Sequence, residues 1–370
     1  CGVSIFVTGS LLCALSRSFE MMVASRVLQG IGGACTMSIN TALLRLIFPP
    51  ARLGRVIATN AVIVAVTAAG GPALGGAILA VGHWSWIFLI NIPLGLAALT
   101  VGWKLLPHNP PSETERKLDG QSVVMNAVFF GLLIYTIEGL AHGGLSTLLI
   151  LQAIITIIVG VVYVRRQLTI PLPILPLDLL RIRLFALSVC CSICCFTAQM
   201  AALVSLPFLM QRWLGIGVAE TGLVLAAWPL ATMLTAPVAG RALEKVHAGI
   251  LGGCGMLVFS CGLALLALLG NEANQWNLAW RMAICGMGIG LFQTPNNVTI
   301  TTSAPLARSG GASGMLGTAR VLGQTLGTAL VAILFHLSGG EGGEQLCLWT
   351  AFGLAIVAGT LSVVRVQQAK

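Results

Sequence analysis

The sequence predicts an all-α polytopic membrane protein, and three observations lead to this fold class. Only 8% of the 370 residues are charged and 57% are hydrophobic, whereas a soluble domain carries about 25% charged residues. Apolar runs of about 20 residues, the length that spans a bilayer core, recur along the chain. The lysines and arginines gather in alternate gaps between these runs. Lipid is therefore the expected solvent.

Twelve apolar segments follow one another at about the length of a membrane-spanning helix. In chain order they cover residues 1–15, 22–46, 56–80, 84–106, 121–140, 145–164, 184–210, 219–241, 246–270, 276–302, 311–336 and 345–366. The first segment is short, and the chain opens inside it with Cys1 rather than Met. We therefore expect a truncated start.

The basic residues predict the orientation of these segments. The gaps after the second, fourth, sixth, eighth and tenth segments, with the segment ends that border them and the C-terminus, hold fifteen of the twenty lysines and arginines. Cytoplasmic loops are enriched in these residues, so this set and the C-terminus are predicted to be cytoplasmic. The net charge of +9 therefore indicates topology. No basic stripe with interleaved aromatics is present, and we expect no nucleic-acid partner.

The eleven cysteines do not predict a metal centre. Most lie inside apolar runs, where a cysteine behaves as a small hydrophobic residue. The cluster CCSICC, Cys190 to Cys195, has C-x-x-C spacing but no histidine or second cysteine pair close by, as a zinc site would require. No metal or other cofactor is expected. The absence of a nucleophile–base grouping or phosphate loop also predicts that the protein is not an enzyme.

Polar residues interrupt the second segment in the stretch RVLQGIGGA. Arg26 and Gln29 are three residues apart and share a helix face, while Gly30 and Ala34 predict a close helix contact. An arginine within lipid is costly, so we expect Arg26 to face a polar interior. The alternative is an arginine near the extracellular boundary that snorkels to water.

The third segment concentrates poor helix formers in the stretch TAAGGPALGGA, residues 67–77. Gly71 and Gly75 are four residues apart, as are Pro72 and Gly76, which gives two adjacent faces of small residues. Such faces allow helix backbones to approach closely, and a proline adds a kink. We predict a packing surface here rather than a catalytic site.

Several polar groups mark the second half of the chain. The cavity candidates are Gln199, Trp228, Gln293, Asn296, Asn297 and Arg320. Amides suit a cavity wall that accepts varied substrates, and they equally hold helices together; both interpretations stay open. Arg320 either pairs across the bundle or snorkels, and Gly323 and Gly327 beside it predict close packing.

Two further features have competing interpretations. Glu138, in YTIEGLAHGG, is a weak candidate for a proton site, because a proton-coupling acid needs burial; the simpler interpretation is an acid at the membrane interface. The stretch RRQLTIPLPILPLDLLRIR lies either along the cytoplasmic interface or forms an extended linker.

Taken in order, these motifs resemble the major facilitator superfamily, specifically its fourteen-helix drug:proton antiporters of the multidrug efflux type. Arg26-x-x-Gln29-Gly30 looks like the fourth-helix motif of that family, and Gly71-Pro72-x-x-Gly75-Gly76 looks like its fifth-helix antiporter motif. WSWIFLINIPLG is similar to the opening of the sixth helix, and RSGGASGMLGTARVLGQTLGTAL resembles the penultimate helix. The chain is most similar to uncharacterised Gram-negative members of this branch.

The resemblance implies a domain organisation. The chain would contain about 12 of 14 helices, without helices one and two, in a fold of two six-helix halves plus two extra central helices. The implied regions are the N-terminal half at 1–106 with helices three to six, a cytoplasmic loop at 107–120, the extra helix pair at 121–164, an interfacial linker at 165–183 and the C-terminal half at 184–370.

The resemblance also implies a function. A secondary active transporter in the bacterial inner membrane would export lipophilic or cationic drugs by alternating access, coupled to protons. Arg26 would bias the proton affinity of an acidic partner, and the fifth-helix glycines would seal the cavity. The expected partners are the lipid bilayer, a small amphipathic substrate and protons, and the protein would act as a monomer. The alternatives are a proton-coupled transporter of an endogenous metabolite, whose cavity would show more than one inward arginine or lysine if the substrate is an anion, and a truncated non-transporting fragment.

Overall fold

The computed structural model describes residues 2–106, 119–143, 146–170, 173, 175–270, 274–338 and 342–368. Helices are the only regular elements in these ranges. They are α1 (Gly2–Ala14), α2 (Phe19–Ile47), α3 (Pro50–Val81), α4 (Trp86–Leu89), α5 (Asn91–Leu105), α6 (Gly120–Gly143), α7 (Thr147–Thr169), η1 (Leu177–Arg181), α8 (Arg183–Phe208), η2 (Leu209–Trp213), α9 (Val218–Leu225), α10 (Ala227–Ala242), α11 (Ala248–Ala267), α12 (Gln275–Ser303), η3 (Leu306–Arg308), α13 (Ser309–Leu337) and α14 (Gly343–Gln368).

Each of the twelve predicted segments coincides with one helix or with two consecutive helices. Eight helical stretches in the described residues are long and apolar enough to cross a membrane. Neither α2 nor α12 is among these eight, and both carry polar side chains that the sequence singles out. An all-helical membrane fold is therefore established, while the count of twelve helices out of fourteen stays a prediction.

The chain forms two compact units, and α3 contributes to both. Unit 1 contains Cys1–Leu43 and Gly70–Asp119, and unit 2 contains Leu44–Ala69 and Gly120–Lys370. In unit 1, α1 packs against α4 and α5 and closely against α2. A Cβ atom added at Gly9 would lie 2.5 Å from the backbone nitrogen of Gln29, and one at Gly32 would lie 2.3 Å from that of Phe6.

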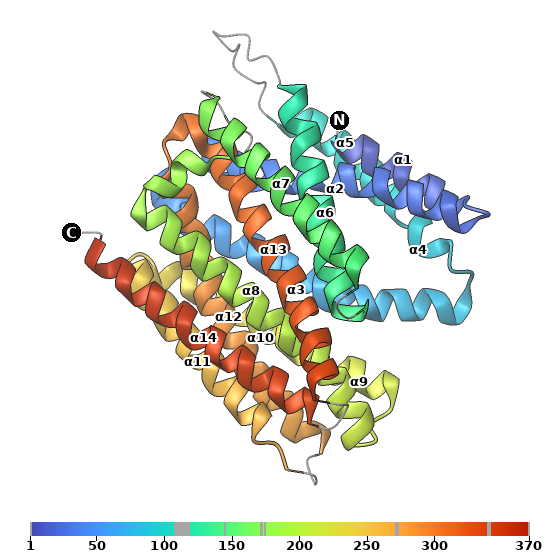
Figure 1. Cartoon of the computed structure of the whole chain (residues 1–370). Helices are drawn as coiled ribbons and strands as arrows, with labels where there is room; N and C mark the ends of the chain where they lie inside the picture. The colour runs from blue at the N-terminus through green and yellow to red at the C-terminus, as the bar shows by residue number, and fades with distance from the viewer. Residues whose placement is uncertain are drawn as a thin grey trace. The chain divides into compact units, whose positions relative to one another are not determined.

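Unit 2 is built around α8, which packs against α13 on one side and α14 on the other (Figure 1). Helix α14 also contacts α11, which packs on α12, and α12 in turn packs on α10. Glycines bring these helices together: a Cβ atom at Gly323 or Gly327 would lie 2.8 or 2.6 Å from a carbonyl oxygen of α8. The close packing predicted for α13 is therefore confirmed.

The polar stretch before α8 ends in a packed turn. Leu177–Arg181 forms a short 3-10 helix, and Leu179 is buried in an apolar cluster with Phe185 and Ile300. Asp178 forms an ion pair with Arg308, at 2.9 Å between Oδ2 and Nη1. An extended linker is therefore wrong for this part of 165–183. The predicted loop at 107–120 lies almost wholly outside the described residues.

Candidate functional site

The first candidate group lies in unit 1 and joins α1 to α2. Arg26 donates a hydrogen bond from Nη1 to Oε1 of Gln29 at 3.2 Å, which confirms that they share a helix face. Gln29 is buried and donates from Nε2 to Oγ of Ser10 at 2.7 Å. The exposed guanidinium of Arg26 lies 4.6 Å from the ring centroid of Phe88, within cation–π range.

The predicted glycine contacts stay predictions. Nothing in the described residues lies within 4 Å of a Cβ atom added at Gly30, whereas Gly32, two residues on, makes a close contact with α1. A Cβ atom at Gly71 or Gly75 likewise meets no described atom within 4 Å. The side-chain surroundings of Pro72 and Gly76 lie outside the described residues. The fifth-helix packing surface stays a prediction.

The second candidate group lies in unit 2, where Asn296 of α12 ties three helices together. Its Nδ2 donates to Oγ of Ser192 on α8 at 2.7 Å, and its Oδ1 accepts from Nη1 of Arg365 on α14 at 2.6 Å. Asn296 is 1% exposed. Of the two interpretations of the amides, Asn296 therefore follows the second, in which an amide holds helices together.

Arg365 is a buried charged residue at the end of this network, and the sequence motifs do not single it out. Its position near the basic C-terminus predicts only a cytoplasmic location, yet Arg365 is 1% exposed. Its guanidinium donates to Oγ of Ser188 at 2.9 Å, to Asn296, and to both the carbonyl and the hydroxyl oxygen of Ser362. The i, i+3 spacing of Ser362 and Arg365 was the available signal, because it places a hydrogen-bonding partner on the arginine's own helix face.

The remaining candidates divide between the core and partly exposed positions. Trp228 is 2% exposed and packs edge-on against Phe259, so it is a core residue in this structure rather than a cavity wall. Arg320 lies 5.2 Å from the ring centroid of Phe196 on α8, and its buried Nε has no hydrogen-bond partner among the described residues. Arg320 is thus placed against α8, but without an acidic partner there.

Three other amides and one acid complete the predicted set. Gln199, Gln293 and Asn297 are partly exposed, and the buried Oδ1 of Asn297 has no hydrogen-bond partner in the described part of the chain. These positions are compatible with a cavity wall. The side chain of Glu138 lies outside the described residues.

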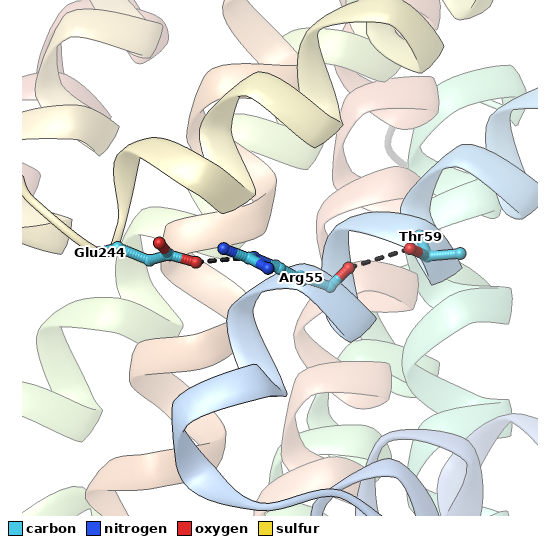
Figure 2. Close-up of polar contacts among 3 residues, drawn as sticks. All are labelled: Arg55, Thr59 and Glu244. Atoms are coloured by element: carbon cyan, nitrogen blue, oxygen red, sulfur yellow. Dashed lines mark hydrogen bonds and ion pairs between the residues drawn. The ribbon is translucent and has the colours of Figure 1, made fainter.

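A cavity of about 500 Å³ opens in unit 2 where α3 and α12 meet the N-terminus of α11. Its polar lining consists of Arg55, Glu244, His247, Thr299, Thr302 and Arg365. Arg55 and Glu244 form an ion pair at 2.7 Å, and Thr59 donates to the carbonyl oxygen of Arg55 at 3.0 Å; Figure 2 shows both contacts. None of these lining residues belongs to a sequence motif or a candidate site predicted above.

The described residues contain no group of three or more histidine, cysteine, aspartate or glutamate side chains that could hold a metal ion. The cysteines of the CCSICC cluster are free thiols carried on α8. Cys191 donates to the carbonyl oxygen of Ala358 at 3.5 Å. The cluster therefore contributes to the contact between α8 and α14.

Long apolar helices, buried arginine–amide contacts and glycine-packed interfaces together define a polytopic membrane protein. The Major Facilitator Superfamily description matches residues 1–328 and 188–367. The chain belongs to this superfamily, and the protein is a membrane-embedded transporter.

Curated relatives extend this result. The chain is 50% identical over 368 residues to the uncharacterized transporter YebQ of Escherichia coli, covering 100% of this chain and 80% of YebQ. It is 28% identical to the riboflavin transporter RibZ of Clostridioides difficile, covering 91% of this chain and 73% of RibZ. It is also 28% identical to the multidrug efflux pump LfrA of Mycolicibacterium smegmatis, covering 89% of this chain and 66% of LfrA. None of these names is that of an enzyme.

The fold also matches a solved transporter structure. The human organic anion transporter MFSD10 (TETRAN) superimposes with a TM-score of 0.69 at 16% identity, covering 98% of this chain and 75% of that chain. At this identity the likeness supports the fold alone. It agrees with the all-helical architecture predicted from the apolar segments.

Proposed function

We propose that this protein is a proton-coupled exporter of lipophilic or cationic compounds that works by alternating access in the bacterial inner membrane. Its C-terminus would be cytoplasmic, as the distribution of basic residues predicts, and it would act as a monomer. The motif order of the fourteen-helix antiporters and the multidrug efflux pump among the relatives support this assignment. Substrates would enter from the bilayer or the cytoplasm and leave against inward proton flow.

The observation that supports proton coupling is the environment of the Arg26 guanidinium. Its hydrogen bond goes to a neutral amide and its guanidinium lies over an apolar ring. No ion pair neutralises its charge in the described part of the chain. A positive charge held in this way lowers the proton affinity of a nearby carboxyl group. This is the role that the fourth-helix motif implies for Arg26.

The test is efflux of a fluorescent lipophilic cation from cells that express the protein. We expect Arg26→Ala to abolish efflux, with the membrane level of the protein unchanged, and a proton uncoupler to abolish efflux in the unmodified protein. Arg17→Ala is the matched control, because Arg17 is an exposed arginine before α2 that belongs to no motif. Normal efflux from the Arg26→Ala variant would contradict the assignment.

A second candidate function is proton-coupled transport of an endogenous anionic metabolite. It is favoured by Arg320 and Arg365, which both lie against other helices of unit 2 rather than in loops. The riboflavin transporter among the relatives shows that metabolite transport occurs at similar identity. Arg320→Gln separates the candidates: it should abolish uptake or export of an anionic substrate and leave efflux of lipophilic cations within about twofold.

A further inference from the structure

The cavity of unit 2 contains a buried positive charge that no carboxylate neutralises. Arg365 is 1% exposed, and its hydrogen-bond acceptors are all neutral: Ser188, Asn296 and Ser362. An arginine has five N–H donors, and one on Nη2 has no acceptor among the described residues. Burying an ion without a counter-ion is costly. The geometry therefore favours a bound anion close to this guanidinium.

The rest of the cavity lining adds positive rather than negative potential. Its charged residues are Arg55, Glu244 and Arg365, and Glu244 is already paired with Arg55 at 2.7 Å. The charge on Arg365 therefore remains in excess. The backbone at Ala248 and Gly249 also lines the cavity, at the N-terminus of the 20-residue helix α11. A helix N-terminus carries a partial positive charge and can present N–H groups to anions. Here the N–H groups of Gly249, Ile250 and Leu251 already donate to His247, whereas that of Ala248 has no acceptor among the described residues.

Glycines of α11 bring this helix terminus against the arginine. A Cβ atom at Gly252 would lie 2.6 Å from Oγ of Ser362 and 3.2 Å from Nη2 of Arg365, and one at Gly249 would lie 2.8 Å from the carbonyl oxygen of Ser362. His247 accepts a hydrogen bond at Nδ1 from the Gly249 N–H at 3.1 Å and so caps the helix. The imidazole is thus held in place at the rim of the cavity.

We propose that this cavity is a binding site for a phosphate group, contacted by Arg365 and the N-terminus of α11. The volume of about 500 Å³ exceeds the need of an inorganic phosphate ion and accommodates a glycerophosphate headgroup. By the orientation rule the cavity lies at the cytoplasmic side, where basic pockets between helices bind anionic lipid headgroups. The phosphate group of an anionic phospholipid and free inorganic phosphate share this chemistry.

The test uses the full chain purified in detergent and two probes. Inorganic phosphate is titrated at constant ionic strength while thermal unfolding is followed. In parallel, native mass spectrometry measures retention of phosphatidylglycerol against phosphatidylcholine of the same acyl composition. A shift with inorganic phosphate alone identifies the free ion, preferential retention of phosphatidylglycerol alone identifies the headgroup, and both results together identify a site that takes either.

Two variants and one control connect binding to the cavity. Arg365→Gln removes the charge, and Thr302→Glu adds a carboxylate at an exposed position of the lining. We expect each variant to weaken, at least tenfold, the binding of whichever probe binds the unmodified protein. Leu306→Glu adds the same charge to η3, at a residue that is 59% exposed and lies outside the lining, and should change binding less than twofold.

Thr302→Glu keeps the proposal testable if Arg365→Gln does not fold, since Thr302 is not in the buried network. Binding of neither probe to the unmodified protein would overturn the proposal. Unchanged binding to a folded Thr302→Glu variant would overturn it as well. None of these measurements depends on transport, so they are independent of the proposed export function.

Discussion

Arg26 in unit 1 and Arg365 in unit 2 each lie at one end of a hydrogen-bond network. The two networks contain the same chemical groups in the same order. In both, the guanidinium donates to a side-chain amide oxygen, and the amide nitrogen donates to a serine hydroxyl on another helix. The two differ in burial: Arg26 is exposed, whereas Arg365 is 1% exposed. The same residue types therefore serve two different purposes.

This difference shows that surroundings rather than composition set the value of a polar contact. An exposed arginine that loses one partner stays accessible to others, so little stability depends on it. A buried arginine that loses a partner leaves donors unsatisfied, and hydrogen bonds to charged groups contribute about 1.5–3 kcal/mol. We therefore expect the network of unit 2 to matter for folding and Arg26 to matter mainly for transport.

The largest expected effect tests whether the unit 1 network depends on close helix contact. Gly9→Ala would place a Cβ atom 2.5 Å from the backbone of Gln29, and overpacking of this kind costs about 3 kcal/mol at the upper end. Gly30→Ala is the control on the partner helix, because nothing described lies within 4 Å of it. Chemical denaturation in detergent should show a large loss of unfolding free energy for Gly9→Ala and no loss for Gly30→Ala. If the two variants were equally stable, the unit 1 network would not depend on the close contact between α1 and α2.

The next effect measures the buried network directly. Asn296→Ala should lower the free energy of unfolding by about 2 kcal/mol, because it leaves an N–H of Arg365 without its acceptor. Asn297→Ala is the matched control: it removes the neighbouring amide, whose Oδ1 has no partner in the described residues. We expect that control to change stability by less than about 0.5 kcal/mol. A larger loss of stability from Asn297→Ala than from Asn296→Ala would mean that Asn297, and not Asn296, holds the helices together.

The smallest effects belong to the exposed end of the unit 1 network. Gln29→Ala loses the bond to Ser10 and should cost about 1 kcal/mol, less than Asn296→Ala. Arg26→Ala should cost under about 0.5 kcal/mol, measured by the same denaturation. If Arg26→Ala destabilised the protein as strongly as Asn296→Ala, burial would not explain the difference between the two networks.

The sequence predicted the helical elements well because membrane spans impose long apolar runs that any window detects. It did not predict the breaks at Ile90 and Ala226, which separate α4 from α5 and α9 from α10. The sequence makes Trp228 a cavity candidate, whereas it is 2% exposed and lies in the core. Hydropathy reports how long an apolar run is, and it does not report which neighbour covers each face.

The candidate site was predictable only in part, for a related reason. Asn296 was identified from its residue type, but its role depended on Ser192 and Arg365 in two other helices. Arg365 lies near a basic terminus, where a sequence pattern indicates topology. Its burial arises from Ser188 and from the glycines of α11, which are more than a hundred residues away along the chain and share no pattern with it.

The end of α12 has a consequence for how the chain folds. The carbonyl oxygens of Thr301 and Ala304, in the last turn of α12 and at its C-cap, accept from the guanidinium of Arg45, which lies 256 and 259 residues earlier. These two carbonyl groups therefore gain the hydrogen bonds from Arg45 only once α12 has packed against a segment synthesised long before it. Such a distant contact closes a long loop, which slows folding. Synthesis of 184–370 as a separate piece would leave these carbonyl groups without their donor.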